Sequence, residues 1–226
     1  TRRFSLHTKV VLTTTVLLIV LGAGFIFVAE YGNAKTLSDL PPADKVMASL
    51  FQSVTARTAG YNTVDIGLLR EGTLLAIIFL MFVGASPSSM GGGVKTSTAA
   101  ILFISLVGSV TGKRDPLAFG RQIPQQTVYK AFTIVTISVM LISLVTLTLS
   151  FTEAAPIFSL LFEVTSAFGT VGLSTGITPK LSDAGKVLIT LTMFAGRVGT
   201  LTLLMALALR PRKERLKYPE GKIVIG

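Results

Sequence analysis

The sequence has no cysteine and a single histidine, His7, so it has neither a disulfide framework nor a thiolate metal site. Charged residues are also scarce: they make up 14% of the 226 residues, whereas hydrophobic residues make up 50%. A run of 20 uncharged residues is long enough to cross a hydrocarbon core of about 30 Å as a helix. Long stretches with almost no charge occupy residues 10–29, 72–112, 131–152 and 187–209. The sequence therefore excludes an ordinary soluble domain and predicts an all-α polytopic membrane protein.

The net charge of +10 is confined to three segments, residues 1–9, 113–130 and 210–226. These segments hold 13 basic and 3 acidic residues, and the rest of the chain holds eight of each. A nucleic-acid-binding protein would also be basic, but here the basic segments alternate with the hydrophobic ones. This is the distribution that the positive-inside rule gives to cytoplasmic segments. We therefore expect a multi-pass protein of the cell membrane with cytoplasmic basic loops and C-terminus, and no nucleic-acid partner.

Two short glycine-containing stretches, Thr-Ala-Gly-Tyr-Asn at 58–62 and Thr-Val-Gly-Leu-Ser at 170–174, lie 112 residues apart. The same offset pairs Ile77 with Ile189, Met81 with Met193 and Gly84 with Gly196. The chain is therefore predicted to be a tandem duplication of helix, re-entrant pore loop and helix. We expect loops at 57–64 and 167–178, and helices at 8–31, 43–56, 67–83, 97–111, 127–151, 156–165 and 183–210.

The two loops have the composition of a cation filter. A dehydrated cation needs oxygen ligands, and backbone carbonyls supply them where residues alternate in handedness, which glycine allows at little cost. The C-terminus of each preceding half-helix adds partial negative charge. An ordinary extracellular turn is the alternative for either copy alone. The candidate filter residues are Thr58, Ala59, Gly60, Tyr61, Thr170, Val171, Gly172 and Leu173, and their carbonyls are the expected ligands of the metal ion.

A glycine-rich stretch at 84–98 interrupts a hydrophobic helix at membrane depth. Such backbone is tolerated only against protein or a water-filled cavity. Val94 separates the last glycine from the lysine, so the stretch is not a nucleotide-binding loop. It is predicted to be a gate across the pore or, alternatively, a passive kink. Its candidate residues are Gly84, Pro87, Gly91, Gly92, Gly93 and Lys95.

Arg197 occupies the equivalent place in the second repeat, next to Gly196. A permanently charged side chain in mid-membrane points to a functional site. In a pore it would oppose cation passage and so belong to the gate. The alternative is a structural ion pair with an acid such as Glu163.

These motifs resemble the Trk/Ktr/HKT family of potassium transporters, and most nearly the membrane subunits of bacterial Ktr systems. The resemblance rests on T-A-R-T-A-G-Y-N, F-G-T-V-G-L-S, M-F-V-G-A-S-P-S-S-M-G-G-G-V-K-T-S-T and M-F-A-G-R-V-G-T. It implies potassium uptake, filter glycines at 60 and 172, a gating loop at 84–98 and a pore arginine at 197. It also implies a non-enzyme with no covalently bound cofactor, a homodimer activated by Na⁺, and a cytosolic regulatory ring that binds ATP, ADP or NADH.

Family members carry four helix–loop–helix units, and this chain resembles the last two. We therefore expect a third unit at 1–115, a cytoplasmic linker at 116–130, a fourth unit at 131–210 and a cytoplasmic tail at 211–226. The remaining two filter-bearing units would belong to the same polypeptide, of which this chain would be a piece. A sodium-coupled carrier with discontinuous helices is the alternative function, although the repeats of such carriers usually have opposite topology. A purely structural membrane subunit is a third reading, which would not explain paired filter glycines.

Overall fold

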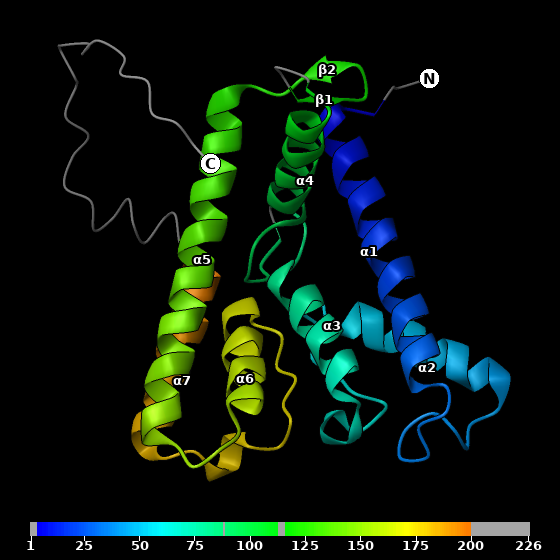
Figure 1. The fold of residues 1–226 in the computed structure, drawn as a ribbon, viewed down its shortest axis with the longest axis vertical. Helices are drawn as coiled ribbons and strands as arrows, with labels where there is room; N and C mark the ends of the chain where they lie inside the picture. Colours follow the sequence, from blue (N-terminus) through cyan, green and yellow to red (C-terminus); the bar gives the residue numbers. More distant parts are fainter. Residues whose placement is uncertain (1–3, 88, 113–115, 200–226) are drawn as a thin grey trace.

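The structure, a computed structural model, describes residues 4–87, 89–112 and 116–199 (Figure 1). The described residues are mainly helical, as predicted, and contain seven α-helices, two 3-10 turns and one small hairpin. Helix α1 begins at a local signal: Ser5 caps its N-terminus by accepting a hydrogen bond from the Thr8 N–H.

The first repeat contains α1 (Leu6–Glu30), the half-helix α2 (Pro42–Thr55), the 3-10 turn η1 (Ile66–Leu68), α3 (Glu71–Phe82) and α4 (Thr96–Val110). Pro42 is the first residue of α2, where its missing N–H costs nothing. With 14 residues, α2 is about 21 Å long and too short to cross a bilayer. The chain therefore turns back from α2 through the first glycine loop.

A short hairpin of β1 (Leu117–Ala118) and β2 (Arg121–Gln122) links the repeats. The second repeat then contains α5 (Gln125–Thr152), the half-helix α6 (Ile157–Gly169), the turn η2 (Thr178–Lys180) and α7 (Asp183–Val198). The turns η1 and η2 begin 112 residues apart, and so do α3 and α7. The offset read from sequence motifs is thus also the offset between equivalent elements.

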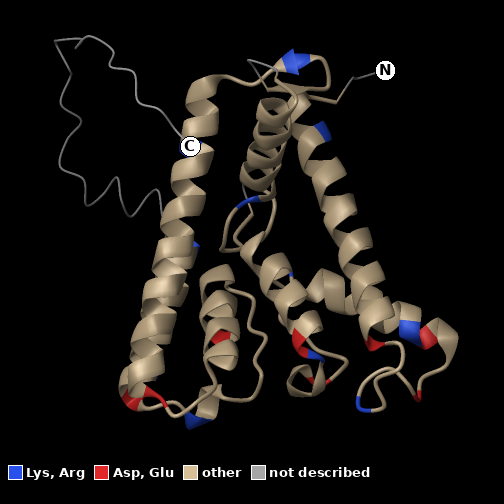
Figure 2. Cartoon of the chain, viewed as in Figure 1, with Lys and Arg blue, Asp and Glu red and all other residues tan. Residues whose placement is uncertain are grey.

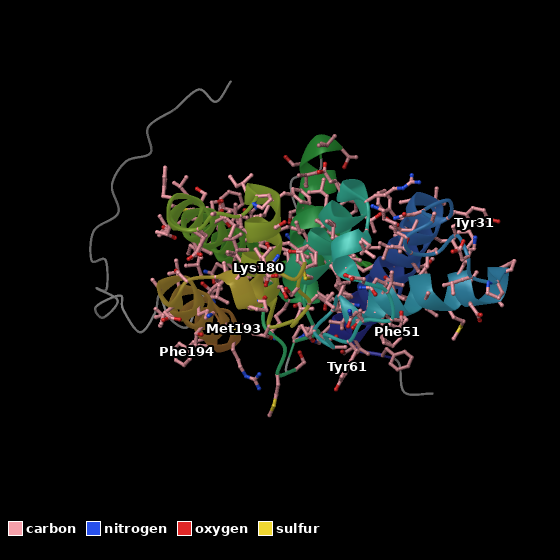
Figure 3. The ribbon with its side chains drawn as sticks, turned by 90° about the horizontal axis from the view of Figure 1, so that it is seen from below. Tyr31, Phe51, Tyr61, Lys180, Met193 and Phe194 are labelled. Carbon is pink, nitrogen blue, oxygen red and sulfur yellow. The ribbon has the colours of Figure 1, made fainter. Side chains whose placement is uncertain are left out.

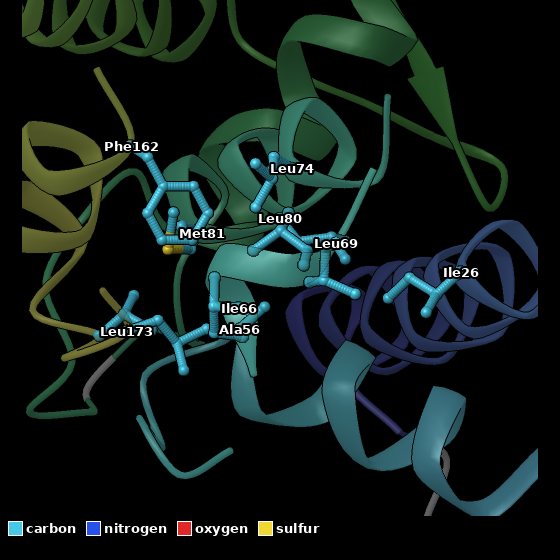
Figure 4. Close-up of a cluster of buried hydrophobic side chains, with 11 residues drawn as sticks. Ile26, Ala56, Ile66, Leu69, Leu74, Leu80, Met81, Phe162 and Leu173 are labelled. Carbon is cyan, nitrogen blue, oxygen red and sulfur yellow. The ribbon is translucent and has the colours of Figure 1, made fainter. Parts of the chain in front are cut away.

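The two repeats pack on each other through α3 with α6 and through α4 with α5. A buried cluster forms where they meet (Figure 4). It combines first-repeat side chains with Phe162, Val171 and Leu173 of the second repeat. Val171 and Leu173 are 4% and 3% exposed. The side chains of the second glycine loop are therefore part of the protein core.

The outer surface of the long helices is apolar. Helices α1 and α5 are long and hydrophobic enough to cross a membrane. Each exposes large hydrophobic side chains along its length, such as Val16, Val20 and Val28 on α1 and Met140, Leu144 and Phe151 on α5. Contiguous exposed apolar surface of this kind fits contact with lipid.

Acidic residues are confined mainly to one end of the molecule. In Figure 2 the acidic residues of the described parts lie toward the end that carries the α1–α2 and α5–α6 connections, where basic residues accompany them. The opposite end carries the β1–β2 hairpin and the start of α1, with basic residues such as Lys9 and Arg121. Both repeats begin at this basic end (Figure 1).

Two expectations need correction. Helix α3 starts at Glu71 rather than near 67, because residues 66–68 form the 3-10 turn η1. Helix α6 continues to Gly169 rather than ending near 165, so the second loop starts at 170. The ion pair of Arg197 with Glu163, given above as the alternative to the gate, is not found among the described residues, where Glu163 accepts hydrogen bonds from Ser174, Thr175 and Thr178 instead. The predicted end of the last helix at 210 and the tail at 211–226 lie outside the described residues.

Candidate functional site: two glycine loops above a glycine-rich segment

Both glycine loops have backbone that alternates in handedness. In the first loop (residues 58–64) Thr58 and Gly60 have positive φ angles of 77° and 79°. In the second loop (residues 170–177) Thr170 and Gly172 have positive φ angles of 51° and 93°. The residues between them do not have positive φ. Sequence reasoning predicted left-handed glycines, but it did not identify the two threonines, for which this conformation costs about 1–2 kcal/mol.

The two loops lie against each other. A β-carbon at position 60 would be 2.1 Å from the carbonyl oxygen of Val171, so only glycine fits there. At position 172 a β-carbon would have the α-carbon of Gly60 as its nearest atom, at 3.8 Å. Residues separated by more than 100 positions in the sequence thus form one backbone surface.

The equivalent residues Tyr61 and Leu173 differ in their surroundings. The Tyr61 side chain is 73% exposed, whereas that of Leu173 is buried. The hydroxyl of Thr55 donates a hydrogen bond to the carbonyl of Tyr61. Figure 3 views the molecule from the end with the acidic turns, and there Tyr61 lies along one edge with Phe51, Met193 and Phe194. These side chains are all exposed, so the two loops are open on this edge of the chain.

The glycine-rich segment between α3 and α4 (residues 83–95) folds back on itself. Val83 and Val94 form a parallel bridge, and the Thr96 N–H donates to the Ala85 carbonyl at 3.2 Å. A β-carbon at Gly84 would lie 2.3 Å from the Gly92 carbonyl oxygen. The two arms of the segment therefore touch, and this requires glycine at position 84.

The return arm of this segment contacts both loops. The Gly92 N–H donates a hydrogen bond of 2.8 Å to the hydroxyl oxygen of Thr170. A β-carbon at Gly91 would lie 2.9 Å from the hydroxyl oxygen of Thr58. Gly93, with a φ of 74°, packs beside Gly169. The glycine triplet thus lies next to the first residue of each loop.

The other predicted gate residues have distinct positions. The ammonium group of Lys95 donates to the carbonyls of Ser89 and Gly91, so it braces the segment internally. Pro87 is half-buried in the same segment. Arg197 is exposed near the end of α7. Its neighbour Gly196 packs against the end of α6, where a β-carbon would lie 1.9 Å from the Phe168 carbonyl oxygen.

Arg57 was missed by sequence reasoning. Its guanidinium group donates to the carbonyl of Gly84 at 3.2 Å and to that of Thr15 at 3.5 Å. It therefore ties the base of the first loop both to the start of the glycine-rich segment and to α1. A charge inside a re-entrant segment is the signal that could have identified it. No group of three acidic or histidine side chains gathers as a metal site within the described parts of the chain.

Comparisons with known proteins agree with this arrangement. The TrkH family, described as cation transport proteins, matches residues 3–218. The chain is 40% identical over 225 residues to Ktr system potassium uptake protein B of Bacillus subtilis, covering 100% of this chain and 50% of that protein. It is 37% identical over 231 residues to the potassium/sodium uptake protein NtpJ of Enterococcus hirae, covering 100% of this chain and 51% of that protein.

A solved structure has the same fold. The crystal structure of the potassium transporter TrkH from Vibrio parahaemolyticus aligns with a TM-score of 0.73 at 22% sequence identity. The alignment covers 87% of this chain and 43% of that one. The chain spans about half the length of the relatives that it matches. The resemblance stated from the sequence motifs is confirmed, and the chain belongs to the TrkH family of cation transport proteins.

Proposed function

We propose that this chain forms half of a potassium-uptake pore in the cell membrane, with the two glycine loops as half of its selectivity filter. The observation that carries the proposal is the paired alternation of backbone handedness at Thr58–Gly60 and Thr170–Gly172. With the side chains of Val171 and Leu173 buried in the core, the backbone of the second loop is left to line the pathway. Potassium as the ion is suggested by the printed names of the relatives.

Electrostatics supports a cation as the transported ion. Helices α2 and α6 both end immediately before the loops, so their partial negative ends adjoin the proposed filter. The ligands in this chain would be the carbonyls of Thr58, Ala59 and Gly60 in the first loop and of residues 170–173 in the second. The Tyr61 carbonyl already accepts a hydrogen bond from Thr55, so it is a weaker candidate than its equivalent, Leu173.

Two loops line only part of a ring. The edge that carries the exposed Tyr61, Phe51, Met193 and Phe194 is the side on which further loops would complete it (Figure 3). We propose that two more filter-bearing units of a longer polypeptide occupy this edge. The basic end of the molecule would face the cytoplasm, as the positive-inside rule requires. The β1–β2 hairpin at that end would then be available to a nucleotide-binding regulatory ring, in a homodimer activated by Na⁺.

The glycine-rich segment would be the gate. It contacts both threonines at the start of the loops, where it would close the pathway below the filter. Arg197, exposed and beside the base of the second loop, would add a repulsive charge to the same barrier. A passive kink would have no reason to contact both loops.

Flux through the full-length transporter in liposomes tests the proposal. A gated pore should pass Rb⁺ and K⁺ down their gradients, and Arg197→Ala should raise that flux. A sodium-coupled carrier, the alternative, would instead show saturable uptake with a fixed Na⁺ stoichiometry. Unchanged or lower flux in a well-folded Arg197→Ala protein would refute the role of the arginine. Absence of any downhill flux would refute the pore.

A further inference from the structure

Glu163 is a buried carboxylate placed directly behind the second glycine loop. It lies in α6 and is 5% exposed. Its Oε1 atom accepts hydrogen bonds from the Ser174 hydroxyl and, at 3.1 Å, from the Thr175 N–H. Its Oε2 atom accepts one from the Thr178 hydroxyl at 2.8 Å. All three donors belong to the segment that immediately follows Leu173.

Among the described residues this carboxylate is compensated by hydrogen bonds and not by a basic side chain. The ion pair found within the described ranges joins Lys186 to Asp183 on the surface of α7, away from Glu163. A buried acid without a cation is costly unless several donors surround it. Burial of the Glu163 carboxylate therefore costs free energy, and its observed effect is to hold the outer end of the second loop.

The first repeat holds its loop differently. The residue equivalent to Glu163 is Phe51, which is 39% exposed and carries no polar group. There the Thr55 hydroxyl bonds to the Tyr61 carbonyl, and Arg57 anchors the base of the loop. Only the second loop is thus fixed at its outer end by a carboxylate.

We propose that Glu163 is a positioning residue that sets the ion preference of the second loop, an inference that rests on the proposed filter. Residues 170–173 are bounded on one side by the end of α6 and on the other by Ser174 and Thr175. Glu163 belongs to α6 and binds both of those residues. It therefore fixes the span across which the carbonyls of 170–173 are arranged, and so the size of the ion that they fit.

The test compares two glutamate-to-glutamine substitutions, one at Glu163 and one at Glu153. Glu163→Gln keeps the shape of the side chain but leaves one acceptor oxygen for three donors. We expect the K⁺/Na⁺ uptake ratio of the full-length transporter in liposomes to fall about tenfold, the size of effect expected when a hydrogen bond to a charged group is lost. The KM for K⁺ should rise as well.

Glu153→Gln is the matched control. Glu153 also accepts hydrogen bonds from a hydroxyl and a backbone N–H, both of Ser182, but Ser182 is the N-cap of α7 and belongs to neither loop. This variant should leave the K⁺/Na⁺ ratio unchanged. Should Glu163→Gln not fold, Thr178→Val removes a single donor and should lower the ratio by a smaller factor.

An unchanged ratio in a folded Glu163→Gln or Thr178→Val protein would overturn the inference, and so would an equal fall in Glu153→Gln. Gly172→Ser separates this failure from failure of the filter itself. A changed ratio in Gly172→Ser with no change in Glu163→Gln would leave the filter standing and reject the role of Glu163. No change in Gly172→Ser would reject the filter.

Discussion

Replacing Gly60 with alanine should damage the protein more than the same replacement at Gly172, although the two glycines occupy equivalent places. Both have left-handed backbone, with φ angles of 79° and 93°, so alanine costs about 1–2 kcal/mol at either position. Only position 60 is also crowded. A β-carbon there would lie 2.1 Å from the Val171 carbonyl oxygen, whereas at 172 the nearest atom would be 3.8 Å away.

The extra cost at position 60 follows from this contact. At 2.1 Å the backbone of one loop has to move by roughly 1 Å to reach normal contact, and overpacking of this kind costs about 1–3 kcal/mol. Gly60→Ala should therefore cost about 2–5 kcal/mol in total, against about 1–2 kcal/mol for Gly172→Ala. Since the displaced atom is a proposed ion ligand, Gly60→Ala should also reduce K⁺ preference by more than tenfold.

The assay measures thermal midpoints of the two variants in detergent and their K⁺, Rb⁺ and Na⁺ uptake in liposomes. Gly24→Ala is the control, because no atom lies within 4 Å of a β-carbon at that helical position. Its ion uptake should match that of the unmodified protein, and its thermal midpoint should not fall, because alanine is the better helix former. If Gly172→Ala were as harmful as Gly60→Ala, the contact between Gly60 and Val171 would not set the difference, and the reasoning would be refuted.

Two further predictions concern the glycine-rich segment and the outer turn. Gly92→Ala should raise basal K⁺ flux about fivefold. A β-carbon 2.7 Å from the Thr170 methyl group would break the hydrogen bond from the Gly92 N–H to Thr170, which is worth about 1 kcal/mol. A flux at or below that of Gly24→Ala would contradict a gate. The hydrogen bonds from the side chain and then the backbone of Ser182 lower the pKa of Glu153 below its usual 4.5. Their stabilisation is present above pH 4.5 and is lost as the pH falls through the lowered pKa. Glu153→Ala should therefore lower the thermal midpoint at pH 7, and the difference from the unmodified protein should vanish in acid; a difference independent of pH would argue against it.

Much of the fold could be predicted from the sequence because membrane helices are set by length and apolarity. The start of α7 was predicted correctly at 183, whereas the start of α3 was predicted at 67, four residues before Glu71. The end of α6 was predicted four residues too early. Residues 166–168 are compatible with either a helix or a loop, so the sequence alone does not show that α6 continues through them to Gly169.

The side-chain contacts of the candidate site could not be predicted in the same way. Thr58 and Thr170 adopt left-handed backbone against the preference of threonine, because the neighbouring loop and the glycine-rich segment enclose them. Such a conformation depends on tertiary contacts, which a local pattern does not contain. For the same reason the sequence offered Glu163 only as an alternative partner for Arg197 and did not identify its hydrogen-bond partners, which lie 11 to 15 residues further along the chain.

The duplicated halves share backbone geometry but not the groups that maintain it. Both loops place positive φ at the same two positions, and both follow a half-helix. The first is anchored by the cation of Arg57 and the second by the anion of Glu163, and neither residue has a charged equivalent in the other repeat. Arg57 and Glu163 are unrelated residues, yet the loops that they hold share one backbone conformation. This indicates that the site depends on the backbone conformation and not on a particular side chain. The opposite charges also act at opposite ends of the loops, the arginine at the base and the glutamate at the outer end. A cation that approaches from the acidic end would thus meet the attractive charge first and the repulsive one beside the proposed gate.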